Sequence, residues 1–141
     1  MADLDWVTRQ IAVGCAPNDY LLNALPSLGI SSLVDMRIEA RHDEMTLAQL
    51  GMRYLHLPTD DGHFPSLDNL EKGIRWIREE TALGHRVFVH CRYGHGRSII
   101  MVAAFLIRCG MSCQDALSLI KGCHPETHPT EEHLAGLASF K

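Results

Sequence analysis

Hydrophobic and polar positions along the chain form short blocks that predict strands and helices in alternation. Apolar runs bounded by turn residues predict strands over residues 6–7, 11–13, 30–36, 53–57 and 86–90. Apolar residues spaced three to four apart, before a terminating residue, predict helices over residues 18–28, 39–50, 67–83 and 98–108. Two more helices are expected to begin at Ser112 and Thr130, which are good capping residues. The first two strands are expected to form a hairpin or an edge pair, and Pro58 to end the fourth strand.

The expected strand over residues 86–90 defines the fold class. Its centre, Val87-Phe88-Val89, is apolar enough to be buried on both faces of a sheet. Strands and helices that alternate around such a strand predict an α/β fold with a central mixed, mainly parallel sheet flanked by helices. Ligands of such sheets bind beyond the carboxyl ends of the strands. Because Cys91 follows this strand directly, the turn from Cys91 to Arg97 is the expected site.

Length and charge narrow the class of protein. A chain of 141 residues suits one domain over residues 1–141, because two separate cores would each be small. A net charge of −4 gives little attraction to nucleic acid, so no nucleic-acid partner is expected. Residues 1–5 lack the features of an export signal, and the longest apolar run, over residues 99–107, is far below the ~20 residues of a membrane span. We therefore expect a soluble cytoplasmic protein without a membrane span, whose five cysteines are reduced.

The segment from His90 to Ser98 carries the candidate chemistry. It reads HCRYGHGRS and joins the central strand to the next predicted helix. A turn with two glycines before a helix makes a nest of backbone N–H groups that binds anions. Gly94 and Gly96 allow the amides to turn inward without a clash at Cβ. The same field favours the thiolate form of Cys91, which makes this cysteine a candidate nucleophile.

Other side chains of the segment fit phosphoryl chemistry. Arg97, six residues after Cys91, can return over the loop and bind two oxygens of a phosphoryl group with its planar guanidinium. Ser98 can donate a hydrogen bond to the sulfur of Cys91, which would make this sulfur a better leaving group. His90 is expected to orient the loop rather than to attack. The expected phosphate-binding loop consists of Arg92, Tyr93, Gly94, His95, Gly96 and Arg97.

This loop resembles the His-Cys-x5-Arg-Ser/Thr motif of the protein tyrosine phosphatase superfamily. The order and length of the predicted elements are similar to those of its small dual-specificity phosphatases, closely from Arg53 to Arg108 and more loosely in the N-terminal third. The resemblance implies a phosphotyrosine phosphatase-like fold and hydrolysis of phosphotyrosine, with phosphoserine or phosphothreonine as further substrates. It also implies a phosphocysteine intermediate, no metal and no organic cofactor.

Members of this superfamily also use a general acid on a loop before the nucleophile. The segment Pro-Thr-Asp-Asp-Gly over residues 58–62 offers Asp60 and Asp61. Two family patterns, Pro-Thr-x-Asp and Asp-Asp-Gly, both select Asp61 as the acid, which leaves Asp60 to brace the loop. Small relatives often carry Pro-Thr-x-x-Gln at the last helix, whereas this chain has His133 in place of the glutamine. Either His133 substitutes for that glutamine or the role is absent.

Two alternative substrates or functions remain open. Arg92 and His95 would make the mouth of the loop basic, and lipid phosphatases of the superfamily place basic residues at these positions. A phosphoinositide or another polyphosphorylated small molecule is therefore an alternative substrate to a phosphorylated protein. A binding module that recognises phosphate without turnover is a second alternative, disfavoured because Cys91, Arg97 and Asp61 are all present.

A metal site was weighed against these phosphate chemistries. The candidate ligands lie near the end of the chain: Cys123, His124, His128 and His133. Prolines interrupt this segment, and the spacing of the four residues matches no common zinc pattern. We expect no metal there, and the sequence carries no signal of oligomeric state.

Overall fold

The computed structural model describes residues 4–141, and Met1 to Asp3 of the segment inspected for an export signal lie outside this range. Its strands are β1 (Leu4–Trp6), β2 (Ile11–Gly14), β3 (Ile30–Arg37), β4 (Arg53–Thr59) and β5 (Arg86–His90). Its helices are α1 (Asp19–Ala24), the short 3-10 helix η1 (Leu25–Leu28), α2 (Glu44–Gln49), α3 (Leu67–Ala82), α4 (Arg97–Arg108), α5 (Cys113–Cys123) and α6 (Glu131–Ala138).

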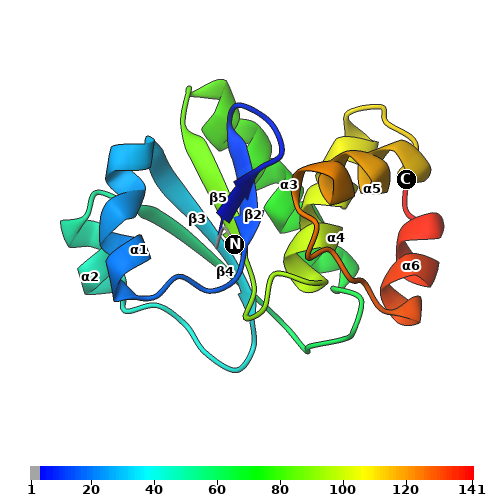
Figure 1. Cartoon of the computed structure of the whole chain (residues 1–141), viewed down its shortest axis with the longest axis horizontal. Helices are drawn as coiled ribbons and strands as arrows, with labels where there is room; N and C mark the ends of the chain where they lie inside the picture. Colours follow the sequence, from blue (N-terminus) through cyan, green and yellow to red (C-terminus); the bar gives the residue numbers. More distant parts are fainter. Residues whose placement is uncertain (1–3) are drawn as a thin grey trace.

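The five strands form one sheet in the order β1-β2-β5-β3-β4. Strands β2, β5, β3 and β4 run parallel, and β1 pairs antiparallel with β2 at the edge. The predicted central strand β5 lies in the middle, and Val87, Phe88 and Val89 are fully buried. The expected α/β fold with a mixed, mainly parallel sheet is therefore confirmed, as is the N-terminal edge pair (Figure 1).

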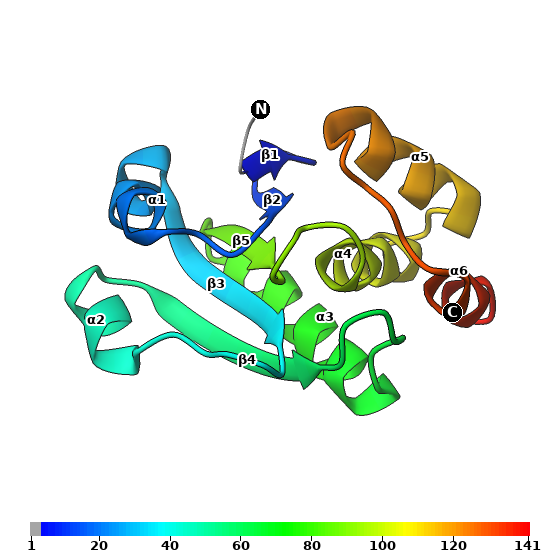
Figure 2. The same cartoon turned by 60° about the horizontal axis from the view of Figure 1, so that its bottom comes forward.

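Helices cover both faces of the sheet and enclose two cores (Figure 2). On one side, α1, η1 and α2 cover a smaller core that includes Leu25, Leu33 and Phe88. On the other side, α3, α4, α5 and α6 pack over a larger core. Helix α4 is buried along most of its length, as its apolar composition predicts. Since β5 leads directly into α4, the connecting loop is supported by the larger core.

Polar capping residues set the starts of most helices. Ser66, Ser112 and Thr130 each accept a hydrogen bond from the backbone N–H three residues later, at the start of α3, α5 and α6. Helix α4 is different, because its N-cap is Gly96 and no side chain caps it. Its first amides are therefore left for another partner, and they lie in the predicted anion-binding turn.

Two predicted boundaries are wrong. The helix expected over residues 39–50 begins only at Glu44, because Asp43 caps it by accepting from the N–H of Thr46. Residues 39–43 form a loop instead. Strand β4 continues through Pro58, which was expected to end it. A proline is tolerated there because β4 is an edge strand and needs no second row of backbone partners.

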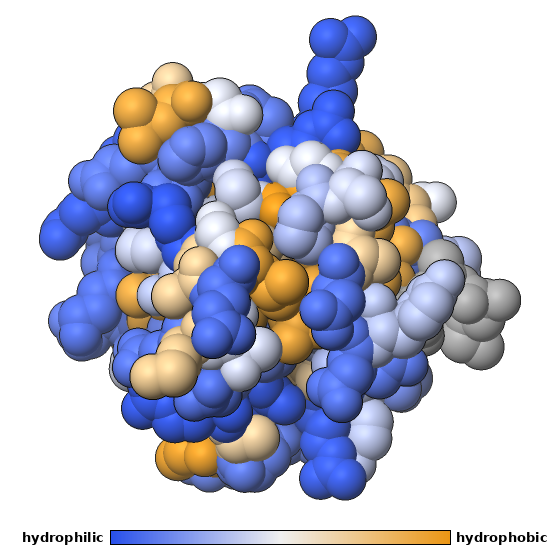
Figure 3. Space-filling model, turned by 90° about the vertical axis from the view of Figure 1, so that its left-hand side faces the viewer, coloured by the Kyte–Doolittle hydropathy of each residue, from blue (hydrophilic) through white to orange (hydrophobic). Residues whose placement is uncertain are grey.

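Figure 3 shows the side of the molecule that carries α1 and α2. Hydrophobic residues are visible near the centre of this face, with hydrophilic residues around them. Leu21 and Leu50 on this side are only partly buried against the smaller core.

None of the helices within residues 4–141 combines the length and hydrophobicity that crossing a membrane requires.

Candidate active site

Cys91 lies directly after β5, at the carboxyl edge of the parallel strands. The backbone N–H of Gly94 donates to its sulfur at 3.3 Å, and the Oγ of Ser98 lies 3.3 Å from the same sulfur. Two hydrogen-bonding groups thus converge on Sγ at the uncapped start of α4. Both interactions stabilise a thiolate, because an N–H and an O–H donate to a negatively charged sulfur.

The two glycines of the loop are required for different reasons. Gly94 has a φ of +74°, and a Cβ at this position would lie 2.7 Å from the backbone carbon of Gly14. A Cβ on Gly96 would lie 2.4 Å from the ring of His133. The loop therefore packs against the end of β2 on one side and against α6 on the other, and each contact excludes a side chain.

Arg97 is the largest fully buried side chain near the loop, only 1% exposed. Its Nη1 and Nη2 donate to the two carboxylate oxygens of Glu39 at 2.7 and 2.8 Å, and Nη1 also donates to the Thr59 carbonyl at 2.8 Å. Its Nε is buried and has no hydrogen-bond partner among the described residues. The guanidinium is thus held by Glu39 and Thr59, and its Nε–H takes no part in these bonds, so it can donate to an oxygen of a ligand.

Glu39 was missed by the sequence analysis, which placed it in a helix. Its pKa is lowered to about 2, first because Arg97 donates hydrogen bonds to it. Burial opposes the charge of Arg97, but Glu39 more than compensates and raises the pKa of Arg97. The available signal was position, because Glu39 follows β3 and parallel strands β3 and β5 end at the same edge.

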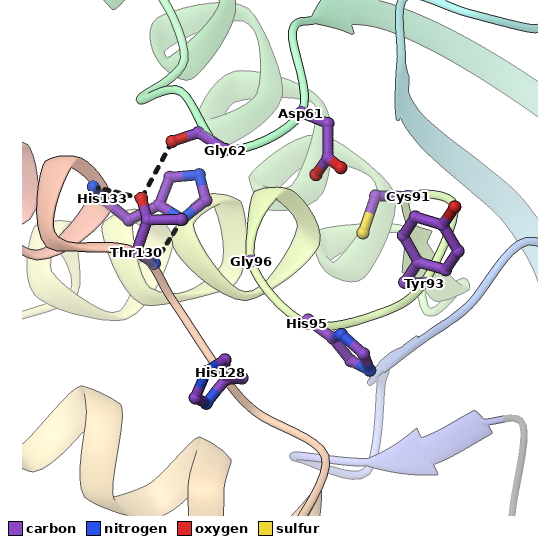
Figure 4. A pocket seen from close by; sticks show the side chains of 9 residues that line it. All are labelled: Asp61, Gly62, Cys91, Tyr93, His95, Gly96, His128, Thr130 and His133. Atoms are coloured by element: carbon purple, nitrogen blue, oxygen red, sulfur yellow. Dashed lines mark hydrogen bonds between the residues drawn. The ribbon is translucent and has the colours of Figure 1, made fainter.

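Asp61, the predicted general acid, lines the same pocket as Cys91 (Figure 4). One of its carboxylate oxygens lies 3.7 Å from the Nε of Arg97. In Figure 4 the side chains of Asp61 and Cys91 both point into the pocket. The carbonyl of Asp60, by contrast, accepts from the N–H of His63 within the loop. Asp61 lines the pocket and Asp60 is not among its lining residues, and the role of Asp61 as the general acid stays a prediction.

The site thus contains a cysteine whose sulfur contacts two hydrogen-bonding groups, a buried arginine and a carboxylate that lines the same pocket. Residues 10–111 match a family model described as "Polymorphic toxin system, DSP-PTPase phosphatase". The chain belongs to this phosphatase family. The resemblance to protein tyrosine phosphatases of the dual-specificity type, first inferred from the motif, is confirmed.

The names of individual relatives refer to protein phosphatases and to lipid phosphatases. The human "Phosphatidylglycerophosphatase and protein-tyrosine phosphatase 1" is 46% identical over 61 residues, 43% of this chain and 30% of its own length. The mouse "Protein tyrosine phosphatase type IVA 2" is 34% identical over 101 residues, 69% of this chain and 59% of its own. The matched segments therefore span less than two thirds of these curated relatives.

Solved structures match the phosphatase over nearly its whole length. PTPMT1 in complex with PI(5)P superposes with a TM-score of 0.91 at 26% identity, covering 99% of this chain and 94% of the other. Tk-PTP in its active form has a TM-score of 0.86 at 25% identity and covers 96% of both chains. The agreement includes the N-terminal third, which the motif comparison related only loosely to the family.

His133 stands at the position where small relatives often carry a glutamine, and both of its ring nitrogens form hydrogen bonds. In the phosphatase its Nδ1 accepts from the backbone N–H of Thr130 at 3.0 Å. The other nitrogen, Nε2, therefore carries the proton and donates to the His63 carbonyl at 2.9 Å. Burial lowers the pKa of His133, which favours this neutral form. With both nitrogens occupied, His133 holds the loop after Asp61 and has no ring nitrogen left to bind a water.

Four side chains join the start of α6 to the loop over residues 60–65, which contains Asp61 and is called the acid loop below. Thr130 Oγ1 donates to the Gly62 carbonyl at 2.8 Å (Figure 4), and His133 Nε2 donates to the His63 carbonyl. Glu132 accepts from the backbone N–H of Phe64 at 2.8 Å, and His63 Nδ1 lies 3.1 Å from the same carboxylate. The segment after Asp61 is thus held by α6 in addition to the bond from His63 N–H to the Asp60 carbonyl within the loop.

His90 contacts the backbone of the phosphate-binding loop at Cys91. It is fully buried, and its Nδ1 donates to the Cys91 carbonyl at 3.1 Å. Its Nε2 lies 2.9 Å from the Nε2 of His42, which must therefore be the donor of that bond. Burial lowers the pKa of His90 to about 4, although the nearby carboxylate of Asp35 acts in the opposite direction. His90 is thus a neutral support for the backbone of Cys91.

The mouth of the pocket is lined by aromatic and histidine side chains. The lining residues are Asp61, Gly62, Cys91, Tyr93, His95, Gly96, His128, Thr130 and His133, around a cavity of about 200 Å³. The backbone N–H of His128 donates to the His95 carbonyl at 2.8 Å and holds the two segments together. The guanidinium of Arg92 lies 5.1 Å over the ring of Tyr93. Of the two residues predicted to make the mouth basic, His95 lines the pocket and Arg92 is not among its lining residues, whereas His128, outside the loop motif, is.

The histidines weighed as zinc ligands are engaged separately. His133 binds the acid loop, whereas His124 lies 2.6 Å from Asp5 and 2.7 Å from the Gly94 carbonyl. Because the ring nitrogens of these two residues contact different partners, the structure does not bring them together around one ion.

Proposed function

We propose that this phosphatase hydrolyses phosphomonoesters through a phosphocysteine intermediate on Cys91. The observation that carries the proposal is the set of contacts at Sγ, where Gly94 N–H and Ser98 Oγ both lie at 3.3 Å. A sulfur held in this way is placed to act as the nucleophile, because both groups can donate to a thiolate. The uncapped amides of α4 and the Nε of Arg97 face the place where phosphate oxygens would bind.

In the first step the Cys91 thiolate attacks phosphorus and the bond from phosphorus to the ester oxygen breaks. Asp61 gives its proton to the departing oxygen, so that the product leaves as a neutral alcohol or phenol. Arg97 and the loop amides stabilise the charge on the three remaining oxygens in the transition state. The product of this step is the phosphorylated cysteine.

In the second step Asp61, now a carboxylate, takes a proton from water. The resulting hydroxide attacks phosphorus, the bond to sulfur breaks, and inorganic phosphate is released. The hydrogen bond from Ser98 stabilises the sulfur as it leaves as a thiolate. No metal or cofactor enters either step, so chelators should leave turnover intact.

The leading substrate class is phosphoprotein, with phosphotyrosine and also phosphoserine or phosphothreonine. The cavity of about 200 Å³ is smaller than the ~300–1,000 Å³ typical of pockets that enclose drug-sized ligands. Tyr93 at its mouth is 51% exposed, and a peptide that carries the phosphate could pack against it. The relative named as a type IVA protein tyrosine phosphatase supports this choice.

The second candidate class is a phosphoinositide or another polyphosphorylated small molecule. Its support is that His95 and His128 line the pocket and that Arg92 lies over the ring of Tyr93, another lining residue; all three side chains can donate hydrogen bonds to a second phosphate. PTPMT1, the similar solved structure, contains PI(5)P by its description. A binding module without turnover is the third and least favoured reading.

Replacing the nucleophile tests the mechanism first. Phosphate release is measured in EDTA from a phosphotyrosine peptide, a phosphoserine peptide and a soluble phosphoinositide. Cys91→Ser should abolish release from every substrate, because a serine hydroxyl is not activated by this loop. Cys109→Ser is the matched control, since Cys109 is an exposed cysteine that follows the far end of α4. It should retain full activity.

The same panel decides between the candidate functions. Faster release from the peptides would support a protein phosphatase, and faster release from the phosphoinositide would support the second class. No release that depends on Cys91 would overturn both and favour the binding module. Loss of activity in EDTA would contradict the metal-independent mechanism.

A further inference from the structure

His124 contacts the phosphate-binding loop from outside the family motif. It follows α5 directly and is only 3% exposed. Its Nε2 lies 2.7 Å from the carbonyl oxygen of Gly94. Because a carbonyl only accepts, His124 must donate its Nε2 proton to the loop. A buried side chain far along the chain thus holds the turn that contains Cys91.

The other nitrogen of His124 is held by carboxylates. Nδ1 lies 2.6 Å from the Oδ2 of Asp5 on β1 and 3.5 Å from the Oε2 of Glu126. That Glu126 oxygen is buried and has no hydrogen-bond partner within the described residues. An imidazole whose Nε2 donates to a carbonyl and whose Nδ1 lies beside two carboxylates is held at both ring nitrogens.

A shared metal ion fits these contacts less well. Two ligand atoms on one tetrahedral zinc lie about 3.3 Å apart, given bonds of about 2.0 Å. The 2.6 Å between Nδ1 of His124 and Oδ2 of Asp5 is shorter, and is the length of a charge-assisted hydrogen bond. The group of Asp5, His124 and Glu126 is therefore a hydrogen-bonded support for the loop.

Gly94 links His124 to the nucleophile. Its carbonyl accepts from His124, and its own N–H donates to Cys91 Sγ at 3.3 Å. With a φ of +74°, Gly94 is the loop residue with the most freedom to rotate. Rotation about its backbone bonds would turn the N–H away from the sulfur. The contact with Gly14 blocks this movement on one side, and the bond from His124 restrains the carbonyl.

We propose that His124 is a positioning residue that holds Gly94 with its N–H aimed at the sulfur of Cys91. Asp5 and Glu126 orient the imidazole, so β1 and the segment after α5 both contribute to the reactivity of the nucleophile. The proposal rests on Cys91 being the reactive cysteine of the proposed function. Its test does not require turnover, because it measures the thiolate directly.

The test is the pH profile of Cys91 alkylation by iodoacetamide. Trypsin cleaves after Arg86 and Arg92, and the peptide from Val87 to Arg92 contains Cys91 as its one cysteine, so mass spectrometry can follow this site alone. His124→Leu should move the midpoint of the profile up by about one pH unit, since one hydrogen bond to a charged group is weakened. His124→Gln should restore part of the shift, because its amide can still donate to Gly94.

The matched control is His85→Leu. His85 also pairs with a carboxylate, Glu80, but it precedes the opposite end of β5. Its removal should leave the midpoint unchanged. The titratable groups around Cys91 stay the same in every variant: Asp61, Tyr93, His95, Arg97, His128 and His133.

A second variant covers the case in which His124→Leu does not fold. Asp5→Ala removes the oxygen that orients the imidazole at a position with 20% side-chain exposure. It should move the midpoint in the same direction by a smaller amount. A folded variant at either position with the wild-type midpoint would overturn the proposal. An inactive wild-type protein that still shows the shift would reject the proposed function and leave this inference standing.

Discussion

At the scale of single residues, the bond between Arg97 and Glu39 gives the active site much of its rigidity. A guanidinium that donates to phosphate through Nε must be held in place by its other donors. Nη1 donates to Glu39 and to the Thr59 carbonyl, and Nη2 donates to Glu39. The Nε of Arg97 is thus aimed at the pocket before any ligand arrives, which lowers the reorganisation needed in the transition state.

Glu39→Gln should lower kcat/KM about tenfold or more. The amide keeps one accepting oxygen but loses the charge, and a hydrogen bond to a charged group is worth ~1.5–3 kcal/mol. Glu71→Gln is the control, because Glu71 makes the same two-bond contact with Arg108 at the other end of α4. Equal losses of kcat/KM in the two variants would show that Glu39 has no particular role.

Asp61→Asn should lower kcat by about a hundredfold or more on an alkyl or phenyl phosphate, within the ~10²–10⁴ range of general acid catalysis. The loss should be smaller on para-nitrophenyl phosphate, whose leaving group needs no proton. Asp60→Asn should keep near-normal activity, because the contact seen at Asp60 uses its backbone carbonyl. A larger loss in Asp60→Asn than in Asp61→Asn would reverse the assignment.

Residues within the motif were predictable, and residues that support it from a distance were not. Cys91, Arg97 and Ser98 follow from chemistry at a fixed spacing, and the structure brings them together. Glu39 and His124 reach the loop through folding, across 58 and 30 positions of sequence. No local pattern marks such contacts, since they depend on which strands and helices end at the same edge.

At the scale of elements, helix α6 acts as the support of the acid loop. Its N-cap Thr130 accepts from the N–H of His133 and donates to the Gly62 carbonyl. The same hydroxyl therefore starts a helix and holds the loop next to Asp61. Thr130 therefore contributes both to the stability of α6 and to the position of the loop that carries Asp61.

Thr130→Ala should cost about 1 kcal/mol of unfolding free energy, the usual value for losing an N-cap. It should also lower kcat, because the loop after Asp61 loses one of its bonds. Ser112→Ala removes an equivalent cap from α5, where Ser112 accepts from Asp115 N–H. Urea unfolding should show similar losses in both variants, whereas kcat should fall in Thr130→Ala alone. Equal kcat values would separate α6 from the acid loop.

Element types were predicted well because their signals are local. Capping residues and glycine stops mark the helices, and the apolar run of β5 marks the central strand. The start of α2 was wrong because residues 39–43 contain helix formers that the fold uses in a loop. Their competing role, placing Glu39 against Arg97, appears only when β3 and α4 are packed together.

At the scale of the whole molecule, buried histidines make stability depend on pH. The pKa of His90 is lowered from 6.5 to about 4 in the folded protein, first by burial. The unfolded chain therefore binds a proton at His90 before the folded chain does, and stability falls as pH drops below 6.5 toward 4. The slope for one such group is about 1.4 kcal/mol per pH unit. His42, whose pKa burial also lowers, acts in the same direction.

Between pH 7 and pH 5, His90 alone should thus remove about 2 kcal/mol of unfolding free energy. His90→Asn keeps a donor near the Cys91 carbonyl but has no group that titrates in this range. Urea unfolding at both pH values should show a smaller loss in this variant than in the wild type. Equal losses would assign the pH dependence in this range to other groups, such as His42.

Pro58 within the outer strand β4 limits the pairing of this strand with a strand of another copy of the chain. An open sheet exposes two outer strands, and unpaired backbone groups there can recruit another chain and seed aggregates. In this sheet one outer strand, β1, is three residues long, and the other, β4, contains a proline without an N–H to donate. Neither border offers a long regular template for a new strand. The fold can therefore be concentrated without its sheet growing from molecule to molecule.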